Sequence, residues 1–187
     1  MAGCFVCFER GPSGPGRVGD VAWAGAAVAD DVAVVEGAAG AAYEPGLLAL
    51  REGPVLEAAV RALTVGPDVL LVDATGRDHP RRAGLALHLG AILGQPSAGV
   101  THRPLLATGA WPADERGARS PLHLEGELVG FWLRTRAGTR PLAVHAGWRV
   151  DAEEAVELVL ASTRRPRTPE PLRAARRAAR RARAGAA

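Results

Sequence analysis

Residues Asp68–Asp73 read DVLLVD, with four consecutive apolar residues between two aspartates. The run is far shorter than the roughly 20 apolar residues that a membrane helix needs. It also lacks the alternating polar residues of a strand with one face in water. An uninterrupted apolar run of this length is typical of a strand covered on both faces. We therefore predict a central β-strand. Asp73 follows its last residue, so its carboxylate should lie at the edge of the sheet that the ends of the strands form.

The segments on either side alternate between strand and helix patterns. Short strands are predicted over 17–23, 26–29, 32–36, 97–101, 127–135 and 140–145. Helices are predicted over 54–63, 79–93 and 151–163, with a further arginine-rich helix near the C-terminus. This order predicts an α/β domain with a mixed sheet and helices on its faces.

The chain is long enough for one domain with a full core. We expect a flexible lead-in over residues 1–16, rich in glycine and proline towards its end, then a domain over residues 17–163. Residues 164–187 are expected to form a proline-broken tail rich in arginine and alanine. Cys4 and Cys7 have no second pair of ligands at zinc spacing, so we expect ordinary reduced cysteines. No secretory signal is recognisable, so we expect a cytoplasmic protein. We also expect a monomer.

Positive charge is concentrated at the C-terminal end. All 23 basic residues are arginine, and nine of them lie in residues 164–187 against the single acid Glu170, for a charge of +8. The other 14 arginines face 19 acids, for a charge of −5. Such a tail could attract a nucleic acid, and the alternative is a solvated helix.

Three carboxylates are candidates for chemistry, namely Asp20, Glu52 and Asp73. Each lies beside an apolar run or a helix start, where an acid pairs, takes up a proton or binds a cation. Mg²⁺ prefers oxygen ligands and leaves positions for water and phosphate. If the three acids converge, they predict a Mg²⁺ site, with Mn²⁺ as an alternative, for phosphodiester hydrolysis. Otherwise they are turn, strand-end or surface-helix acids.

Two longer motifs resemble the endonuclease V family, which has a ribonuclease-H-like fold. Residues 70–90 follow the family pattern of an aspartate after a strand, then His-Pro-Arg-Arg and a glycine-rich helix start. Tyr43-Glu44-Pro45-Gly46, followed by Arg51-Glu52, matches a second family segment. The likeness extends from about Gly19 to Pro171.

The resemblance implies a Mg²⁺-dependent DNA repair endonuclease that cuts on the 3′ side of deoxyinosine. It assigns metal binding to Asp20 and Asp73 and a catalytic role to Glu52. It makes Tyr43 the aromatic wedge at the lesion, and an exposed aromatic ring can also stack on bases. Arg81, His102 and Arg103 are candidates for phosphate contact because cations and forked guanidinium groups bind phosphate. The partner could be DNA or RNA.

Two departures from the family pattern leave a second function open. His102 stands where the family has lysine, and Trp148 stands where it has histidine. Loss of those groups would weaken stabilisation of the transition state more than the fold. The alternative to the nuclease is therefore a catalytically weakened or inactive nucleic-acid-binding protein with the same fold.

Overall fold

The computed structural model describes residues 1–9 and 15–186 and contains one eight-stranded mixed sheet. The strands are β1 (Ala2–Phe8), β2 (Val21–Val28), β3 (Asp31–Ala38), β4 (Leu70–Val72), β5 (Ser97–Thr101), β6 (Arg119–Leu124), β7 (Glu127–Leu133) and β8 (Leu142–Ala146). The helices are α1 (Leu48–Arg61), α2 (Leu85–Leu93), α3 (Ala152–Ala161) and α4 (Glu170–Gly185). The strand order is β3-β2-β1-β4-β5-β8-β7-β6, which confirms the predicted α/β class.

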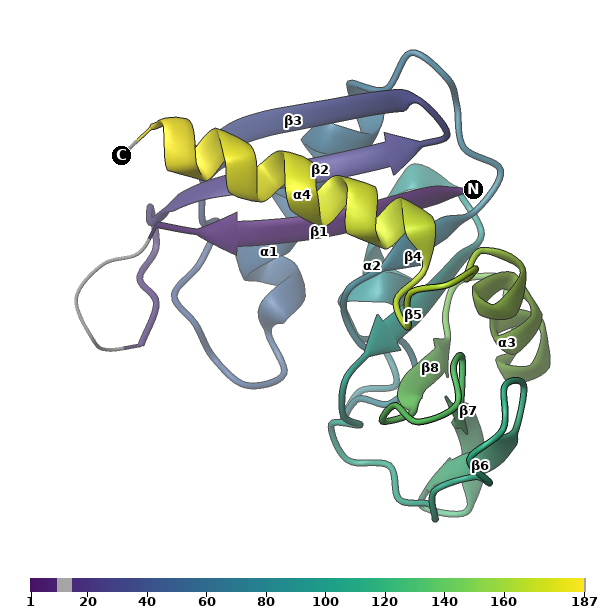
Figure 1. Cartoon of the computed structure of the whole chain (residues 1–187). Coiled ribbons are helices and arrows are strands. Elements are labelled where there is room, and N and C mark those ends of the chain that lie inside the picture. The colour runs from purple at the N-terminus through teal and green to yellow at the C-terminus, as the bar shows by residue number, and fades with distance from the viewer. Residues whose placement is uncertain (10–14, 187) are drawn as a thin grey trace.

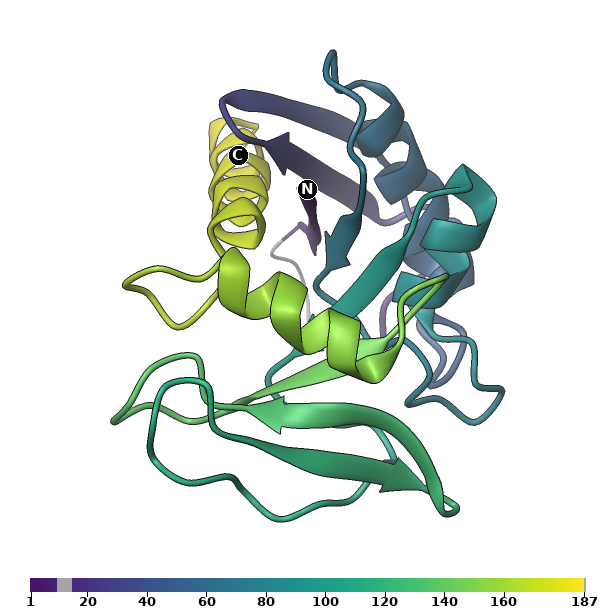
Figure 2. The ribbon, with the colours of Figure 1, turned by 90° about the vertical axis from the view of Figure 1, so that its right-hand side faces the viewer.

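Helices cover both faces of the sheet. Helices α1 and α2 lie behind it in Figure 1, and α4 crosses the front of β1, β2 and β3. Helix α3 packs on β7 and β8, as the rotated view shows (Figure 2). Strand β4 contributes to both layers: Leu70 and Val72 join the core under α1 and α2, whereas Leu71 faces the core under α3. The DVLLVD stretch is thus a central strand buried on both faces, as predicted.

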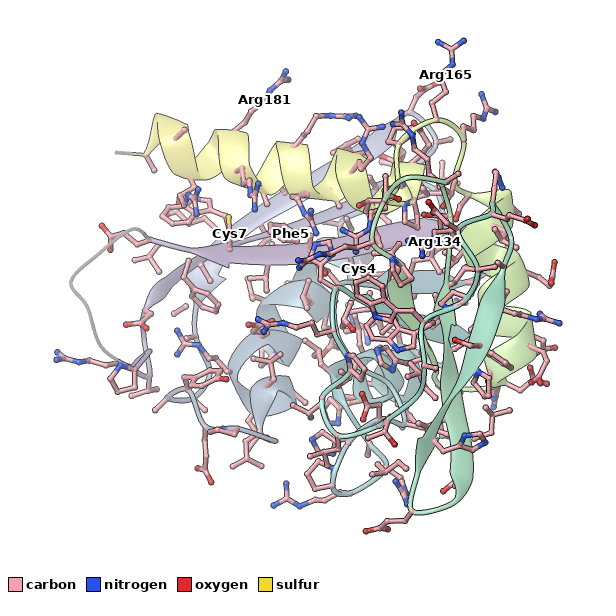
Figure 3. The ribbon with its side chains drawn as sticks, turned by 60° about the horizontal axis from the view of Figure 1, so that its bottom comes forward. Cys4, Phe5, Cys7, Arg134, Arg165 and Arg181 are labelled. Carbon is pink, nitrogen blue, oxygen red and sulfur yellow. The ribbon has the colours of Figure 1, made fainter. Side chains whose placement is uncertain are left out.

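The N-terminal segment is a strand, so the expected lead-in over residues 1–16 is wrong for residues 2–8. Residues 10–14 lie outside the described part of the chain. Strand β1 pairs with both β2 and β4 in the middle of the sheet. Its run AGCFVCF is apolar at nearly every position because both faces are covered. Cys4 and Cys7 point to opposite faces, both are free, and burial raises the pKa of Cys4 to about 12 (Figure 3).

The C-terminal segment is also integral to the domain, which corrects the expected tail over residues 164–187. Helix α4 buries Leu172, Ala175 and Ala179 against the sheet. Two glycines allow this close packing. A Cβ on Gly3 would lie 2.2 Å from the backbone of Pro171, and one on Gly25 would lie 2.4 Å from the carbonyl of Ala175. The domain therefore includes β1 and α4 and does not end at residue 163.

Other boundaries differ in detail. Strand β5 matches the predicted residues 97–101, whereas α1 begins before Pro54 and carries that proline within its first turns. Strand β6 is not among the predicted strands. In the described residues, no helix combines the length and apolar character needed to cross a membrane.

Candidate functional site

Asp73 is the centre of the candidate site, and its carboxylate is bound by an arginine. The backbone N–H of Asp73 donates to the carbonyl of Cys4, which fixes the residue at the end of β4. Arg176 of α4 donates from Nη2 to Asp73 Oδ2 at 2.7 Å, with the two side chains 23% and 21% exposed. In the folded protein the Asp73 carboxylate is therefore already paired with the positively charged guanidinium of Arg176.

Phe5 occupies the position beside Asp73 on the neighbouring strand. Strands β1 and β4 are parallel, with Cys4 opposite Val72, so Phe5 and Asp73 are the next residues in register. The guanidinium groups of Arg176 and Arg180 lie 5.1 and 5.5 Å from the Phe5 ring centroid, within cation–π range. Phe5 points from β1 towards α4 (Figure 3). The nearest position from which a second strand could offer a carboxylate thus holds an aromatic ring.

Glu52 and His102 lie within electrostatic reach of Asp73. Burial raises the pKa of Glu52 to about 7, with Arg51 lowering it and the negative charge of Asp73 raising it further. Burial also lowers the pKa of His102, an effect to which Arg167 and Arg176 add and which Asp73 opposes. Two of the three predicted acids therefore lie near each other, together with a histidine that favours its neutral form.

Asp20 lies elsewhere in the fold. Asp20 lies two residues before Ala22, and Ala22 pairs with Phe8, three residues beyond Phe5 on β1. Asp73 is level with Phe5. Asp20 and Asp73 are therefore offset by five residues along the strand direction, or about 16 Å at roughly 3.3 Å per residue. The Asp20 carboxylate accepts from Arg51 Nη2 and from the Arg17 backbone N–H, both at 2.7 Å. The hydrogen bond from Arg51, followed by that from Arg17, lowers the pKa of Asp20.

The expectation that Asp20 and Asp73 share one metal ion is therefore corrected. Arg51 is buried and also donates to the carbonyls of Arg17 and Ala41, so Asp20 helps to attach the loop before β2 to α1. Among residues 1–9 and 15–186, no three His, Cys, Asp or Glu side chains lie together as metal ligands would. The residues present do not fit the Mg²⁺ site that the resemblance implies.

Tyr43 lies on the rim of a cavity that reaches Asp73. The cavity measures about 240 Å³, and its lining includes Tyr43, Gly46, Asp73, His79 and Thr101. The Tyr43 side chain is 51% exposed. Nε2 of His79 lies 3.0 Å from the Gly46 carbonyl while its Nδ1 accepts from the Arg81 backbone N–H, so His79 braces the cavity wall. We call this space the Tyr43 cavity.

The remaining candidates for phosphate contact, and Trp148, lie in different parts of the structure. Arg81 donates to the Gly46 carbonyl at 3.2 Å, close to the Tyr43 cavity. Arg103 is exposed, and its carbonyl accepts from Thr101 Oγ1. Trp148 lies at the far end of β5, where its backbone N–H donates to Ser97 Oγ. The structure therefore gathers Tyr43, Glu52, Asp73, Arg81 and His102 in one region and leaves Asp20 and Trp148 outside it.

Sequence reasoning missed three residues around the site. Phe5 and Arg176 contact the region of Asp73 from segments that we expected to be a lead-in and a tail. Asp78 is fully buried and accepts hydrogen bonds from three consecutive backbone N–H groups, those of residues 105–107. Nothing in the sequence pattern distinguishes Asp78 from a surface turn residue, because its partners lie almost 30 residues further along the chain.

Known proteins resemble this chain over most of its length. The sequence model described as Endonuclease V matches residues 21–177. The chain belongs to the endonuclease V family. It is 47% identical over 133 residues to Endonuclease V of Roseiflexus sp. (strain RS-1), a match that covers 71% of this chain and 60% of that relative. The match therefore spans less than two thirds of the relative's length.

Solved endonuclease V structures share the fold. The crystal structure of Endonuclease V from Streptomyces avermitilis superposes with a TM-score of 0.88 at 37% identity, covering 100% of this chain and 82% of that one. Endonuclease V of Ciona intestinalis, solved in complex with a 24mer DNA containing an inosine, has a TM-score of 0.78 at 19% identity over 100% of this chain and 86% of that one. At that identity the second comparison supports the fold alone.

Proposed function

We propose that this endonuclease V homologue binds DNA at a deaminated base and hydrolyses the backbone weakly or not at all. The weak or absent hydrolysis is inferred from the 2.7 Å contact between Arg176 and Asp73. A guanidinium group held on a carboxylate neutralises the charge that a divalent cation would need. Phe5 beside it supplies no oxygen ligand.

Support for a nucleic-acid partner comes from the family and from the Tyr43 cavity. The chain belongs to the endonuclease V family, and a more distant member of that family, from Ciona intestinalis, was solved with inosine-containing DNA. Tyr43 is half-exposed at the rim of a cavity of about 240 Å³. An aromatic ring stacks on any base with a gain of roughly 1–3 kcal/mol. A weakly paired base such as inosine leaves the helical stack at a lower cost than a well-paired one.

A Mg²⁺-dependent DNA repair endonuclease is the second candidate, with Mn²⁺ as an alternative cofactor. Family membership and the proximity of Glu52 to Asp73 favour it. For this activity Arg176 has to leave Asp73. Because Asp20 does not lie beside Asp73, other groups also have to supply the remaining metal ligands. It also has to work with His102 and Trp148 in place of the lysine and histidine of the family pattern.

One pair of assays separates the two candidates. Binding of a labelled oligonucleotide with one inosine is measured in EDTA and compared with an undamaged control and with an inosine-containing RNA. Nicking of the DNA is measured with Mg²⁺ and Mn²⁺, with Asp73→Asn as the matched control. We expect preferential binding to inosine without metal, and nicking no faster than in the control.

The possible outcomes are distinct. Metal-dependent nicking that Asp73→Asn abolishes would establish the endonuclease. Equal affinity for damaged and undamaged DNA would refute recognition of a deaminated base.

A further inference from the structure

A second cavity lies between α4 and the loop before it, and arginine dominates its walls. It measures about 250 Å³. We call it the arginine pocket, and it is lined by Pro166, Arg167, Thr168, Arg173, Arg176 and Arg177. No acidic side chain is part of the lining. A concave surface with four guanidinium groups attracts anions.

The positive charge of the arginine pocket is only partly neutralised. Arg173 pairs with Glu170 at 3.3 Å and Arg176 pairs with Asp73. Within the described residues, Arg167 and Arg177 form no ion pair with an acid. Burial lowers the pKa of Arg167, and the nearby Arg140, Arg134 and Arg176 lower it further. The pocket therefore carries surplus positive charge.

Two arginines of the pocket also carry a buried donor that lacks an acceptor. In the described part of the chain, the buried Nε–H groups of Arg167 and Arg176 have no hydrogen-bond partner. Other nitrogens of these side chains are bound, since Arg167 Nη2 donates to the Pro141 carbonyl at 2.9 Å and Arg176 Nη2 donates to Asp73. An unsatisfied buried donor is costly, and a bound anion would remove that cost.

The arginine pocket adjoins the Tyr43 cavity through one pair of residues. Arg176 lines the pocket and contacts Asp73, and Asp73 lines the Tyr43 cavity. A strand whose base enters the cavity would bring its backbone close to these guanidinium groups. A free phosphate would use the same chemistry but would gain nothing from this adjacency.

We propose that the arginine pocket holds a backbone phosphate of a nucleic acid strand whose base occupies the Tyr43 cavity, with no divalent metal between protein and phosphate. This inference rests on the proposed function. Guanidinium groups bind phosphate through paired N–H donors and remain charged throughout the physiological range. In this protein, arginine on α4 thus takes over the contact with phosphate that a metal ion makes in a hydrolytic site.

The test compares two charge-matched double variants in EDTA. Arg173→Gln/Arg177→Gln removes two charges from the pocket without touching the Asp73 contact. Arg180→Gln/Arg181→Gln removes two exposed charges from the next turn of α4. Arg181 points away from the sheet (Figure 3). Fluorescence anisotropy gives the Kd for inosine-containing and undamaged oligonucleotides at several salt concentrations, with circular dichroism as the check of folding.

We expect the pocket variant to bind about tenfold more weakly or worse, as for removal of a charge-assisted hydrogen bond. The slope of log Kd against log salt should fall by about one for each phosphate that the variant no longer neutralises. The matched variant should change either quantity much less. Equal effects of the two variants would overturn the proposal that the arginine pocket binds a backbone phosphate. The proposed function is tested separately, by the ratio of the affinities for inosine-containing and undamaged DNA.

Inorganic pyrophosphate serves as a further probe. If it binds in a manner that depends on Arg173 and Arg177 while oligonucleotide binding does not, the pocket serves a small phosphorylated ligand and the nucleic-acid proposal is overturned.

Discussion

Arg176 contacts Asp73 and Phe5 simultaneously, and those three residues account for the poor fit to a divalent metal. The carboxylate has one cationic partner at 2.7 Å, and the neighbouring strand presents a ring to the same guanidinium. A hard cation needs several oxygen ligands. Two side chains, one on β1 and one on α4, therefore separate this site from one that could hold Mg²⁺.

The double variant Phe5→Asp/Arg176→Ala should gain a metal site. It adds a carboxylate in register with Asp73 and removes the competing charge. We expect Mn²⁺ to bind with a Kd on the order of 10⁻³ M, like the weakest Ca²⁺ sites built from oxygen ligands, whereas we expect no specific binding in that range by the unaltered protein. Isothermal titration calorimetry measures the difference. Arg180→Ala is the control, because it changes the surroundings of Phe5 and leaves Arg176 on Asp73. Equal binding by all three proteins would contradict the role given to Arg176.

Glu52 should make stability depend on pH in the weakly acidic range. Burial raises its pKa from 4.5 to about 7 in the folded protein. The folded state then keeps a proton that the unfolded state has lost, so the free energy of unfolding falls as pH rises from about 4.5 to 7. The loss amounts to roughly 3 kcal/mol at most, and to less to the extent that water reaches and screens this incompletely buried side chain.

Urea denaturation at several pH values checks this effect. Glu52→Gln cannot ionise and should lack the decline. The exposed Glu153→Gln is the matched control and should behave like the unaltered protein. A decline of the same size in Glu52→Gln would assign the pH dependence to another group.

At the scale of elements, local patterns predicted the inner strands well. The apolar run of β4 and the bounds of β5 follow from composition and from the glycine and proline that end α2. Those predictions rest on residues close together in the chain. The proximity of Tyr43, Glu52 and Asp73 is a finding of the structure: Tyr43 and Asp73 line one cavity, and the charge of Asp73 acts on Glu52.

The two terminal elements could not be predicted in the same way. Helix α4 packs against strands from the other end of the chain, through contacts such as Gly3 of β1 against Pro171 and Gly25 of β2 against Ala175. A glycine-containing apolar segment at one end and an alanine and arginine helix at the other carry no local sign of that packing. The prediction that Asp20 lies beside Asp73 was wrong for a related reason. The register of the strands, and not the order of the motifs, decides which acids lie close together.

At the scale of the whole molecule, α4 has two tasks that follow from its two faces. Its alanine face covers β1 and β2, and Cys7, Trp23 and Ala179 share a small core beneath it. Its arginine face carries Arg173 and Arg177 of the arginine pocket. The charge of +8 over residues 164–187 is therefore held in place on the folded domain and not on a mobile tail.

Deletion after Thr163 should consequently unfold the protein. Removal of α4 exposes the front of the sheet beside Phe5, Cys7 and Trp23, and it withdraws Leu172 from the core under α3. Loss of one buried leucine costs roughly 2–5 kcal/mol, and a domain of this size is stable by only about 5–15 kcal/mol in total. We expect the shortened chain to lose its cooperative thermal transition, as followed by circular dichroism. A chain shortened only by residues 184–187, which are exposed where described, is the control and should melt like the full protein. If the chain ending at Thr163 kept a cooperative transition at a similar temperature, α4 would be an appendage, and the arginine pocket would have no fixed wall on which to bind phosphate.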